Sequence, residues 1–289
     1  MKHSFTLGQG PFIKVIFEGP GYFPVEQMQA IFAGRLPPVD ENRSVTQTIR
    51  ISHAPDGSPE TISYRASLDS GSPVCLKREG ELVQWYENAV SSILLRWFKG
   101  WDVFHAGAVA LDGRGIVIPG RRGAGKSTFT AALSLLGFEY LSDEAALVDH
   151  DLGLHPFPKA ISLEAGGWRC IRDIAPKQAQ DSLVWAPKEG ESGKWYVQPP
   201  THKAGSKSQV YPVDFVVLLR RGSGISTAEI PKSEALAGLV DQHMTLWFSS
   251  RTRLKHTVEM VRRARCLAID TFDVNRAVDD LARTVTQGR

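Results

Sequence analysis

The sequence predicts an α/β protein with a mixed β-sheet, preceded by a smaller strand-rich N-terminal domain. Two observations lead to this prediction. Residues 1–80 contain β-branched and aromatic runs that turn residues separate, which is typical of strands. From residue 81 onwards, helical spacing alternates with short apolar runs, which is the pattern of α/β folds. We therefore expect one domain over residues 1–80 and a second over residues 81–289.

The N-terminal strands are predicted from three segments, FIKVIFEG, VTQTIRIS and ETISYRASL. Glycine, proline, aspartate and serine lie between them and favour turns. The period changes at ELVQWYENAVSSILLRWFK (81–99), where apolar residues recur at steps of three and four. This spacing puts them on one face of a helix, so we set the domain boundary near residue 80.

The next elements are predicted from apolar runs and from the residues that flank them. Short strands are expected at 102–110 and 115–119, and a helix from Lys126 to Leu136. Gly137 follows this helix, and glycine is the residue that most often caps a helix C-terminus.

The remainder of the chain is predicted to hold three more strands and one long loop. The strands are LSDEAALVD (141–149), VDFVVLLR (213–220) and CLAIDTF (266–272). Residues 175–210 are rich in Pro, Gly, Lys and Ser, which is typical of a loop. A long loop inside a compact domain is often functional.

Composition places the chain among globular proteins that can bury a core. Of its 289 residues, 42% are hydrophobic and 22% are charged. Its apolar runs are shorter than a membrane span needs, and MKHSFTLGQGPF lacks the apolar core of a signal peptide, so we expect a cytoplasmic protein. The three cysteines are far apart, without C-x-x-C spacing, and are expected to be buried thiols in a reducing cytosol: Cys75, Cys170 and Cys266.

The charge balance argues against nucleic acid as a partner. The net charge is +3, which is too small for the basic stripe that nucleic-acid binding needs. One dense basic cluster falls on a predicted helix, and we interpret it as a solvated face: Arg251, Arg253, Lys255, Arg262, Arg263 and Arg265.

The strongest motif is GRRGAGKST, which follows the apolar run GIVIPG. Its spacing is that of G-x-x-x-x-G-K-[ST], the phosphate-binding P-loop, with a strand before it and a helix after it. The glycines let the backbone amides approach phosphates, Lys126 supplies a positive charge, and the Ser127 hydroxyl can coordinate Mg²⁺. We expect the whole loop to bind ATP: Gly120, Arg121, Arg122, Gly123, Ala124, Gly125, Lys126, Ser127 and Thr128.

Two adjacent acidic residues follow the loop in the chain. Asp143 and Glu144 come seventeen and eighteen residues after Lys126. A carboxylate here can hold Mg²⁺ or take a proton from a nucleophile, but it can equally be a turn or cap residue. Asp149 closes the same run, and we interpret it as a strand-ending turn residue. His105 lies upstream of the loop, and on chemistry alone we favour a packed or hydrogen-bonded role for it.

Three segments at short fixed intervals carry a resemblance to a known family: HAGAVALDGRGIVIPG, GRRGAGKST and GFEYLSDEAALVD. Together they resemble the catalytic domain of the HPr serine kinase/phosphorylase family, whose nucleotide-binding core is also similar to ATP-dependent phosphoenolpyruvate carboxykinase. The closer similarity is to HPr-kinase-related proteins with a different N-terminal domain. The resemblance is strong over 100–170, weaker towards the C-terminus, and does not cover 1–80.

The resemblance implies roles for individual residues. His105 fills the place of a family histidine, and Asp143 that of the general base towards the acceptor hydroxyl. Glu144 replaces the second aspartate of the family's Asp-Asp pair. The family segment L-E-x-R-G reads LEAGG here, so Glu164 is retained, whereas Gly166 replaces an arginine associated with the reverse, phosphorylase direction. A family lysine in the long loop is matched by Lys194.

The function that the resemblance implies is an ATP- and Mg²⁺-dependent kinase acting on a hydroxyl, with a protein or peptide serine as the expected acceptor. Catalysis is assigned to Asp143, His105 and Lys126, and the metal to Ser127, Glu144 and Glu164. A small-molecule alcohol as acceptor, a nucleotide-dependent switch without phosphotransfer, and a carboxykinase-like enzyme stay open as alternatives, the last ranked lowest. Family members are often oligomers, so a homo-oligomer is also expected.

Overall fold

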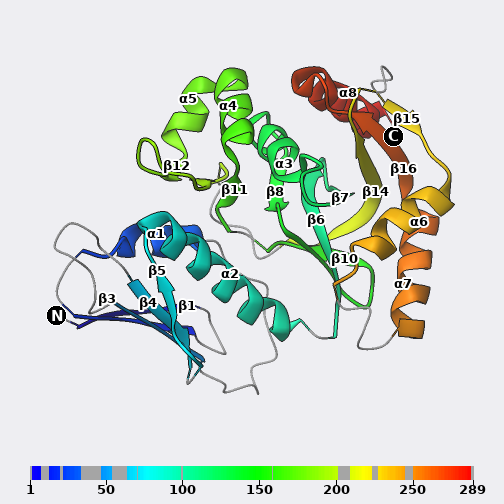
Figure 1. The fold of residues 1–289 in the computed structure, drawn as a ribbon. Coiled ribbons are helices and arrows are strands. Elements are labelled where there is room, and N and C mark those ends of the chain that lie inside the picture. Colours follow the sequence, from blue (N-terminus) through cyan, green and yellow to red (C-terminus); the bar gives the residue numbers. More distant parts are fainter. Residues whose placement is uncertain are drawn as a thin grey trace.

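The computed structural model shows an α/β protein with mixed sheets, as predicted (Figure 1). It describes residues 2–7, 13–19, 22–33, 47–53, 64–69, 71–98, 100–157, 159–200, 209–222, 227–244 and 250–287. No helix in these ranges is both long enough and apolar enough to cross a membrane.

The chain before residue 80 forms a five-stranded sheet in the order β1-β2-β3-β4-β5. Each of the three segments predicted as strands contains an observed strand. Among the strand pairs of this sheet, only β2 and β3 run parallel. Helix α1 (Val25–Ile31) lies between β2 and β3 in the chain. The strands are β1 (Lys2–Leu7), β2 (Ile13–Glu18), β3 (Gln47–His53), β4 (Tyr64–Leu68) and β5 (Val74–Leu76).

Helix α2 (Glu79–Trp97) joins this sheet to the rest of the molecule (Figure 1). Its buried face, which includes Leu82 and Tyr86, packs in one apolar cluster with residues of the N-terminal sheet. The same cluster contains Val103 and Leu147 from the second sheet. The predicted boundary near residue 80 thus precedes a helix that packs against both sheets.

The second sheet has eight strands in the order β10-β9-β6-β7-β14-β16-β15, and β8 pairs with β6 beside β9. Strands β7, β14 and β16 run parallel, while β6, β8, β9, β10 and β15 pair antiparallel with their neighbours. The strands are β6 (Asp102–Leu111), β7 (Arg114–Pro119), β8 (Glu139–Ser142), β9 (Ala145–Val148), β10 (Gly153–His155), β14 (Tyr211–Arg220), β15 (Thr227–Glu229) and β16 (Arg265–Asp270).

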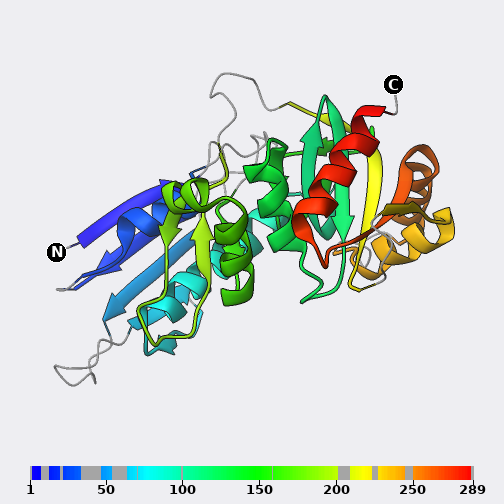
Figure 2. The same cartoon turned by 90° about the horizontal axis from the view of Figure 1, so that it is seen from above.

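Helices cover both faces of this sheet because alternate strand residues are apolar on each face. Phe215 and Val217 of β14 pack in one cluster with α3 (Lys126–Leu135) and α8 (Val274–Gln287). Val216 packs in another cluster, with α6 (Lys232–Asp241) and α7 (Ser250–Arg263). Figure 2 shows α8 and the α6–α7 pair on different sides of the strands.

A smaller three-stranded sheet, in the order β11-β13-β12, lies beside α3. It is formed by β11 (Ile161–Leu163), β12 (Leu183–Trp185) and β13 (Trp195–Val197), with α4 (Ala165–Ile174) and α5 (Pro176–Asp181) between β11 and β12. The prediction of one long loop over 175–210 was therefore wrong in part. Turn residues dominate the composition and conceal helix α5 and the strands β12 and β13. Strand β13, which contains Tyr196 and Val197, pairs with β11 on one side and with β12 on the other. Residues 201–208 of the predicted loop lie outside the described residues.

Three further predictions need correction. The predicted strand 141–149 is interrupted at Asp143 and Glu144, which separate β8 from β9. Cys75 is exposed and Cys170 half-buried, so only Cys266 is a buried thiol. Arg253 is buried rather than solvated, because its guanidinium donates to the Trp101 carbonyl and lies 3.3 Å from the Asp102 carboxylate.

Two adjacent glycines of α4 provide a test of how closely α4 approaches α3. A Cβ at Gly167 would lie 2.6 Å from Thr128 Oγ1, whereas a Cβ at Gly166 would have no atom within 4 Å. We expect Gly167→Ala to lower the free energy of unfolding by about 1–2 kcal/mol through overpacking. Gly166→Ala should raise it by up to about 1 kcal/mol, because alanine is the better helix former. Urea denaturation measures both; equal effects would contradict the close approach.

Candidate active site

The GRRGAGKST loop connects β7 to α3, with the strand and the helix where the sequence predicts them. Strand β7 ends at Pro119, and α3 begins at Lys126 with Gly125 as its N-cap. Gly123 and Gly125 have φ values of +82° and +92°, a left-handed conformation that favours glycine. A Cβ at Gly120 would lie 3.3 Å from the Cβ of Ala124 inside the loop. This geometry turns the backbone sharply into the N-terminus of α3, where helix amides attract anions.

The Lys126 side chain lies along the inside of the loop and is buried. Its ammonium donates to the backbone carbonyls of Gly120 and Arg121. Burial lowers the pKa of Lys126, while the negative charges of Asp143 and Glu144 act in the opposite direction. Lys126 is thus in the electrostatic field of the acidic pair, although Asp143 follows it by seventeen positions in the chain.

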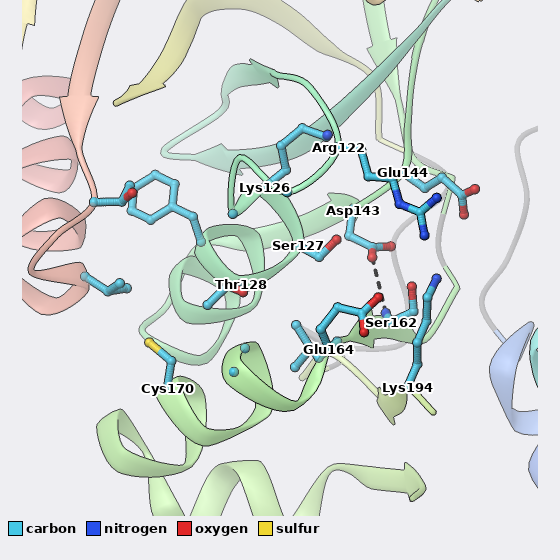
Figure 3. Close-up of a pocket in the computed structure, with 18 of the residues that line it drawn as sticks. Arg122, Lys126, Ser127, Thr128, Asp143, Glu144, Ser162, Glu164, Cys170 and Lys194 are labelled. Carbon is cyan, nitrogen blue, oxygen red and sulfur yellow. Dashed lines mark hydrogen bonds between the residues drawn. The ribbon is translucent and has the colours of Figure 1, made fainter. Parts of the chain in front are cut away.

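A cavity of about 640 Å³ opens against the loop. Most of the predicted site residues line it: His105, Arg122, Gly123, Gly125, Lys126, Ser127, Thr128, Asp143, Glu144 and Glu164 (Figure 3). The predicted residues that do not line it are Gly120, Arg121 and Ala124. The Arg121 side chain is 85% exposed and forms an ion pair with Asp241, at 3.1 Å, so it does not serve the cavity. The volume is in the range of small-molecule binding sites.

Asp143 and Glu144 lie in an irregular segment between β8 and β9. Both strands pair with β6, and the register of β8 on β6 shifts by one residue just before the pair. The Ser142 hydroxyl accepts the backbone N–H groups of Glu144 and Ala145 and so holds this segment in place. Such irregularities re-aim side chains and are frequent next to active sites.

The Asp143 side chain is 1% exposed and is fixed by three groups. Its Oδ1 accepts a hydrogen bond from the Tyr140 hydroxyl at 3.0 Å and lies 3.0 Å from the Lys159 ammonium. Its Oδ2 accepts the backbone N–H of Ser162 at 3.2 Å. A carboxylate oxygen can accept two hydrogen bonds. Oδ2, which accepts this one bond from the described residues, can therefore accept a second from a molecule in the cavity.

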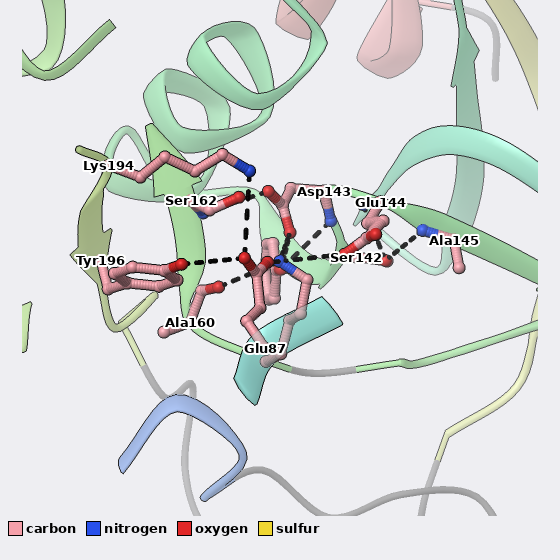
Figure 4. Close-up of polar contacts among 11 residues, drawn as sticks. Glu87, Ser142, Asp143, Glu144, Ala145, Ala160, Ser162, Lys194 and Tyr196 are labelled. Carbon is pink, nitrogen blue, oxygen red and sulfur yellow. Dashed lines mark hydrogen bonds and ion pairs between the residues drawn. The ribbon is translucent and has the colours of Figure 1, made fainter. Parts of the chain in front are cut away.

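Lys159 is the centre of a buried charge cluster that sequence reasoning missed. Figure 4 labels its three acidic partners, Glu87, Asp143 and Glu144. Its ammonium is fully buried and lies 2.8 Å from Glu87, 3.0 Å from Asp143 and 3.3 Å from Glu144. Burial alone would lower the pKa of Lys159, but the three carboxylates, Asp143 most strongly, hold it well above its usual range. Lys159 therefore stays positively charged and compensates the acidic groups behind the cavity.

Glu87 and Glu144 respond differently to this cluster. Burial works against a charged Glu87, but Lys159 and Lys194 hold its pKa below the usual range, and the Tyr196 hydroxyl donates to it at 2.9 Å. Burial raises the pKa of Glu144 in spite of Lys159, and Glu87 adds to the rise. Glu144 is also the more accessible, with 30% of its side chain exposed, against 2% for Glu87.

The sequence gives a signal that Glu87 is buried with a partner, but the spacing of residues gives no such signal for Lys159. Glu87 lies four residues after Val83 and three before Val90, on the buried face of α2. A charged residue on an apolar helix face indicates a buried partner. Lys159 lies in the chain between a proline and Ala160, and nothing in the sequence near it names its partners.

His105 in β6 lines the cavity. Its Nδ1 lies 3.2 Å from Gln242 Oε1, and its backbone N–H donates to the Gln242 carbonyl. His105 therefore has the hydrogen-bonded position that chemistry alone favoured, and it also lines the cavity.

We expect His105 to be neutral at pH 7. Burial and the charge of Lys126 lower the pKa of His105 from 6.5, so protonation favours the unfolded chain and costs stability below pH 6.5. Histidine side-chain NMR should give a titration midpoint below 6.5. Lys126→Ala removes a positive charge and should raise that midpoint. An unchanged midpoint in Lys126→Ala would contradict the coupling.

Residues of β11, α4 and the segment before β13 also line the cavity. Glu164 is the N-cap residue of α4, Gly166 is in its first turn, and Lys194 precedes β13. The Lys194 ammonium lies 3.9 Å from Glu87 and its side chain is 21% exposed. Gly166 lines the cavity but contributes no side chain to it.

The oxygen donors around the cavity suit Mg²⁺. The Ser127 hydroxyl and the Glu144 and Glu164 carboxylates line it. Among the described residues, no three His, Cys, Asp or Glu side chains group as a complete metal site. Mg²⁺ commonly binds through one or two protein carboxylates together with substrate phosphates and water, and the two carboxylates that line the cavity match that donor set. Asp149 lies outside the cavity and accepts the N–H groups of Asp151 and Gly153, as expected of a turn residue.

The arrangement can bind a phosphorylated molecule on one side and hold a hydroxyl group on the other. Loop amides and Lys126 provide the positive side, and Asp143 provides an acceptor for a proton. The chain matches no protein-family model, and no curated protein matches its sequence.

Proposed function

We propose that this protein is an ATP- and Mg²⁺-dependent kinase that transfers the γ-phosphoryl group to a hydroxyl, with a serine of a protein or peptide as the acceptor. One observation carries the proposal: the P-loop and the Asp143–Glu144 pair line the same cavity (Figure 3). A loop of this kind without a facing carboxylate would support binding alone. The facing carboxylate adds a group that can take the acceptor proton.

The GRRGAGKST loop forms the side of the cavity that binds the phosphates. The amides of the loop and of the first turn of α3 surround the β- and γ-phosphates, and Lys126 neutralises their charge. Ser127, Glu144 and Glu164 would hold Mg²⁺, which supplies charge neutralisation on the transferring phosphoryl group when bound. The Lys126 ammonium moves from the Gly120 and Arg121 carbonyls to the phosphates on binding.

Asp143 forms the side of the cavity that binds the acceptor hydroxyl. The acceptor oxygen attacks the γ-phosphorus and forms a new P–O bond, while the bond to the β–γ bridging oxygen breaks and ADP leaves. The acceptor proton passes to Asp143 Oδ2. Tyr140, Lys159 and the Ser162 amide hold the carboxylate in place during this step, so its position is set before substrate binds.

The resemblance of 100–170 to HPr serine kinase/phosphorylase supports this assignment and a P-loop core of the HPr kinase/phosphoenolpyruvate carboxykinase type. In this proposal, residues 1–80 form an accessory domain that contributes to acceptor choice. With Gly166 in place of the family arginine, we expect no phosphorylase activity. A homo-oligomeric state is likewise expected from the resemblance alone.

A nucleotide-dependent switch is the second candidate. The observation that favours it is the acidic pair itself, where Glu144 replaces an aspartate and has a raised pKa. A longer side chain whose charged form is disfavoured by burial is a weaker Mg²⁺ ligand. In this case ATP changes partner affinity, and no phosphorylated product forms.

A transfer assay separates these functions. The purified protein is incubated with γ-labelled ATP and Mg²⁺ in a lysate of its source cells, and the products are separated by size. We expect label on a protein or peptide, lost in Lys126→Ala. Arg121→Ala is the matched control in the same loop and should keep transfer, because its side chain points away from the cavity. Label on a small alcohol would change the acceptor class; tight ATP binding with no product would favour the switch.

A further inference from the structure

We propose that the base of the bound nucleotide stacks on Phe272, in a lobe of the cavity at the ends of β14 and β16. This inference rests on the proposed nucleotide site. Phe272 is 86% exposed, the most exposed large apolar side chain among the described residues. With Cys170 and Val274 it lines both the main cavity and a neighbouring hollow of about 390 Å³.

The strand topology brings Phe272 to the nucleotide. Strands β7, β14 and β16 are parallel neighbours, so their carboxyl ends meet at one edge of the sheet. The P-loop follows β7, Arg221 follows β14, and Thr271 and Phe272 follow β16. All three segments line the same cavity. Ligands of open α/β sheets bind at this edge.

Phe272 is held in its exposed position by the strand ends. Asp270, the last residue of β16, accepts the backbone N–H groups of Phe272 at 2.9 Å and of Gly222 at 3.0 Å. The Thr271 N–H donates to the Arg220 carbonyl at 2.9 Å. These bonds join the ends of β14 and β16, so the aromatic ring stands on a fixed backbone rather than on a frayed end.

The positions of the lining residues fit a nucleotide laid across the start of α3. In Figure 3, Ser127 and Thr128 lie between Asp143 and Cys170. The γ-phosphate end therefore belongs near Asp143, and the nucleoside end near Cys170. At this end Phe272, Val274 and Cys170 line the cavity together with the cation Arg221. Asp173, Asp273 and Asn275 add polar groups to the neighbouring hollow.

These lining residues favour a ligand in which a planar, uncharged group is bonded to an anionic part. A base stacks on an aromatic face whatever its hydrogen-bonding edge, and purines offer the larger surface. Arg221 is placed for the phosphate or ribose that follows the base. A purine nucleoside triphosphate is therefore the ligand class that this lobe fits.

Binding measurements with the whole protein test the proposal by calorimetry. Base stacking on one aromatic residue corresponds to about a 5- to 150-fold change in Kd, so Phe272→Ala should weaken ATP binding by that factor. Phe272→Trp should restore it. Inorganic tripolyphosphate, which has no base, should bind wild type and Phe272→Ala equally. Tyr22→Ala removes another exposed aromatic ring, 58% exposed, and should change neither.

The outcomes separate this inference from the proposed function. If Phe272→Ala binds ATP as wild type does, the stacking site is wrong, while tripolyphosphate binding that is lost in Lys126→Ala still supports the phosphate site. An exposed ring that serves another protein instead would give this result. If wild type binds neither ATP nor tripolyphosphate, both proposals are overturned.

Thiol labelling gives a second readout that needs no change at Phe272. In a Cys75→Ser, Cys266→Ser background, Cys170 is the remaining thiol, and it is half-buried in the lobe. We expect ATP to slow its alkylation by a maleimide at least severalfold, and tripolyphosphate to slow it less. Equal protection by the two ligands would overturn the placement of the base.

Discussion

Replacement of Lys159 by Met is expected to lower the free energy of unfolding by about 3–5 kcal/mol. Methionine fills a similar volume but carries no charge, so Glu87, Asp143 and Glu144 lose the ammonium that lies within 3.3 Å of each. Leaving a buried charge without its partner costs more free energy than the intact ion pair contributes. Guanidinium denaturation monitored by tryptophan fluorescence measures the loss.

The loss should depend on pH. In wild type the raised pKa of Lys159 means that its contribution is present at every pH below about 10.5. In Lys159→Met, burial without the ammonium raises the folded-state pKa values of Glu87 and Glu144 above the unfolded value of about 4.3. The free-energy cost of burying these charged carboxylates is therefore large at pH 7.5, and it shrinks as the pH falls towards 4.3. The difference between wild type and variant should therefore be smaller at pH 5 than at pH 7.5.

Lys188→Met is the matched control. Lys188 also forms an ion pair, 3.3 Å from Glu79, but 68% of its side chain is exposed. Solvent-exposed pairs contribute about 0–1 kcal/mol, so this variant should be close to wild type at both pH values. Equal losses in the two lysine variants would contradict an electrostatic role for the buried cluster.

The elements around the P-loop were predictable because their signals are local. Apolar runs mark β6 and β7, and the helix start is marked by the loop's own glycines. The end of α3 was equally readable. Gly137 has φ +109°, and the N–H groups of Gly137 and Phe138 bond to the carbonyls of Ser134 and Leu133, as expected of a glycine cap.

The contacts behind the carboxylates were not predictable from local patterns. Glu87 and Lys159 are 72 residues apart and meet because α2 packs against both sheets. Arg253 was misread for the same reason, since its partner Asp102 lies 151 residues away. Charge runs on a helix predict a solvated face, and only the packing of distant segments shows which member of the run is buried.

The short strands β12 and β13 show a different limit. Each has three residues, so neither gives a periodic signal, and the turn residues around them dominate the composition. Strand β13 nevertheless pairs with β11, which leads into the cavity-lining residues Ser162 and Glu164, and β12 pairs with β13. The fold class follows from long periodic segments, while the shape of the cavity depends on short ones.

Asp143→Asn is expected to reduce phosphoryl transfer by about 10²–10⁴-fold, the usual contribution of a general base. Asparagine keeps the shape of the side chain and can still accept a hydrogen bond, but it does not take up the acceptor proton. ATP binding should stay within a few-fold of wild type, because the loop and Lys126 hold the phosphates. Calorimetry with ATP and a single-turnover transfer assay measure the two properties separately.

Asp149→Asn and Glu144→Gln make this test specific. Asp149 also follows a strand, but it lies outside the cavity with His155 at 2.6 Å, so its variant should transfer phosphate normally. Glu144→Gln should instead raise the Mg²⁺ concentration needed for half-maximal transfer. Because Asp143→Asn also removes a partner of Lys159, its thermal unfolding is measured alongside, and transfer is compared well below its Tm. Full transfer in folded Asp143→Asn would move the base to another group and leave Asp143 with a structural role beside Lys159.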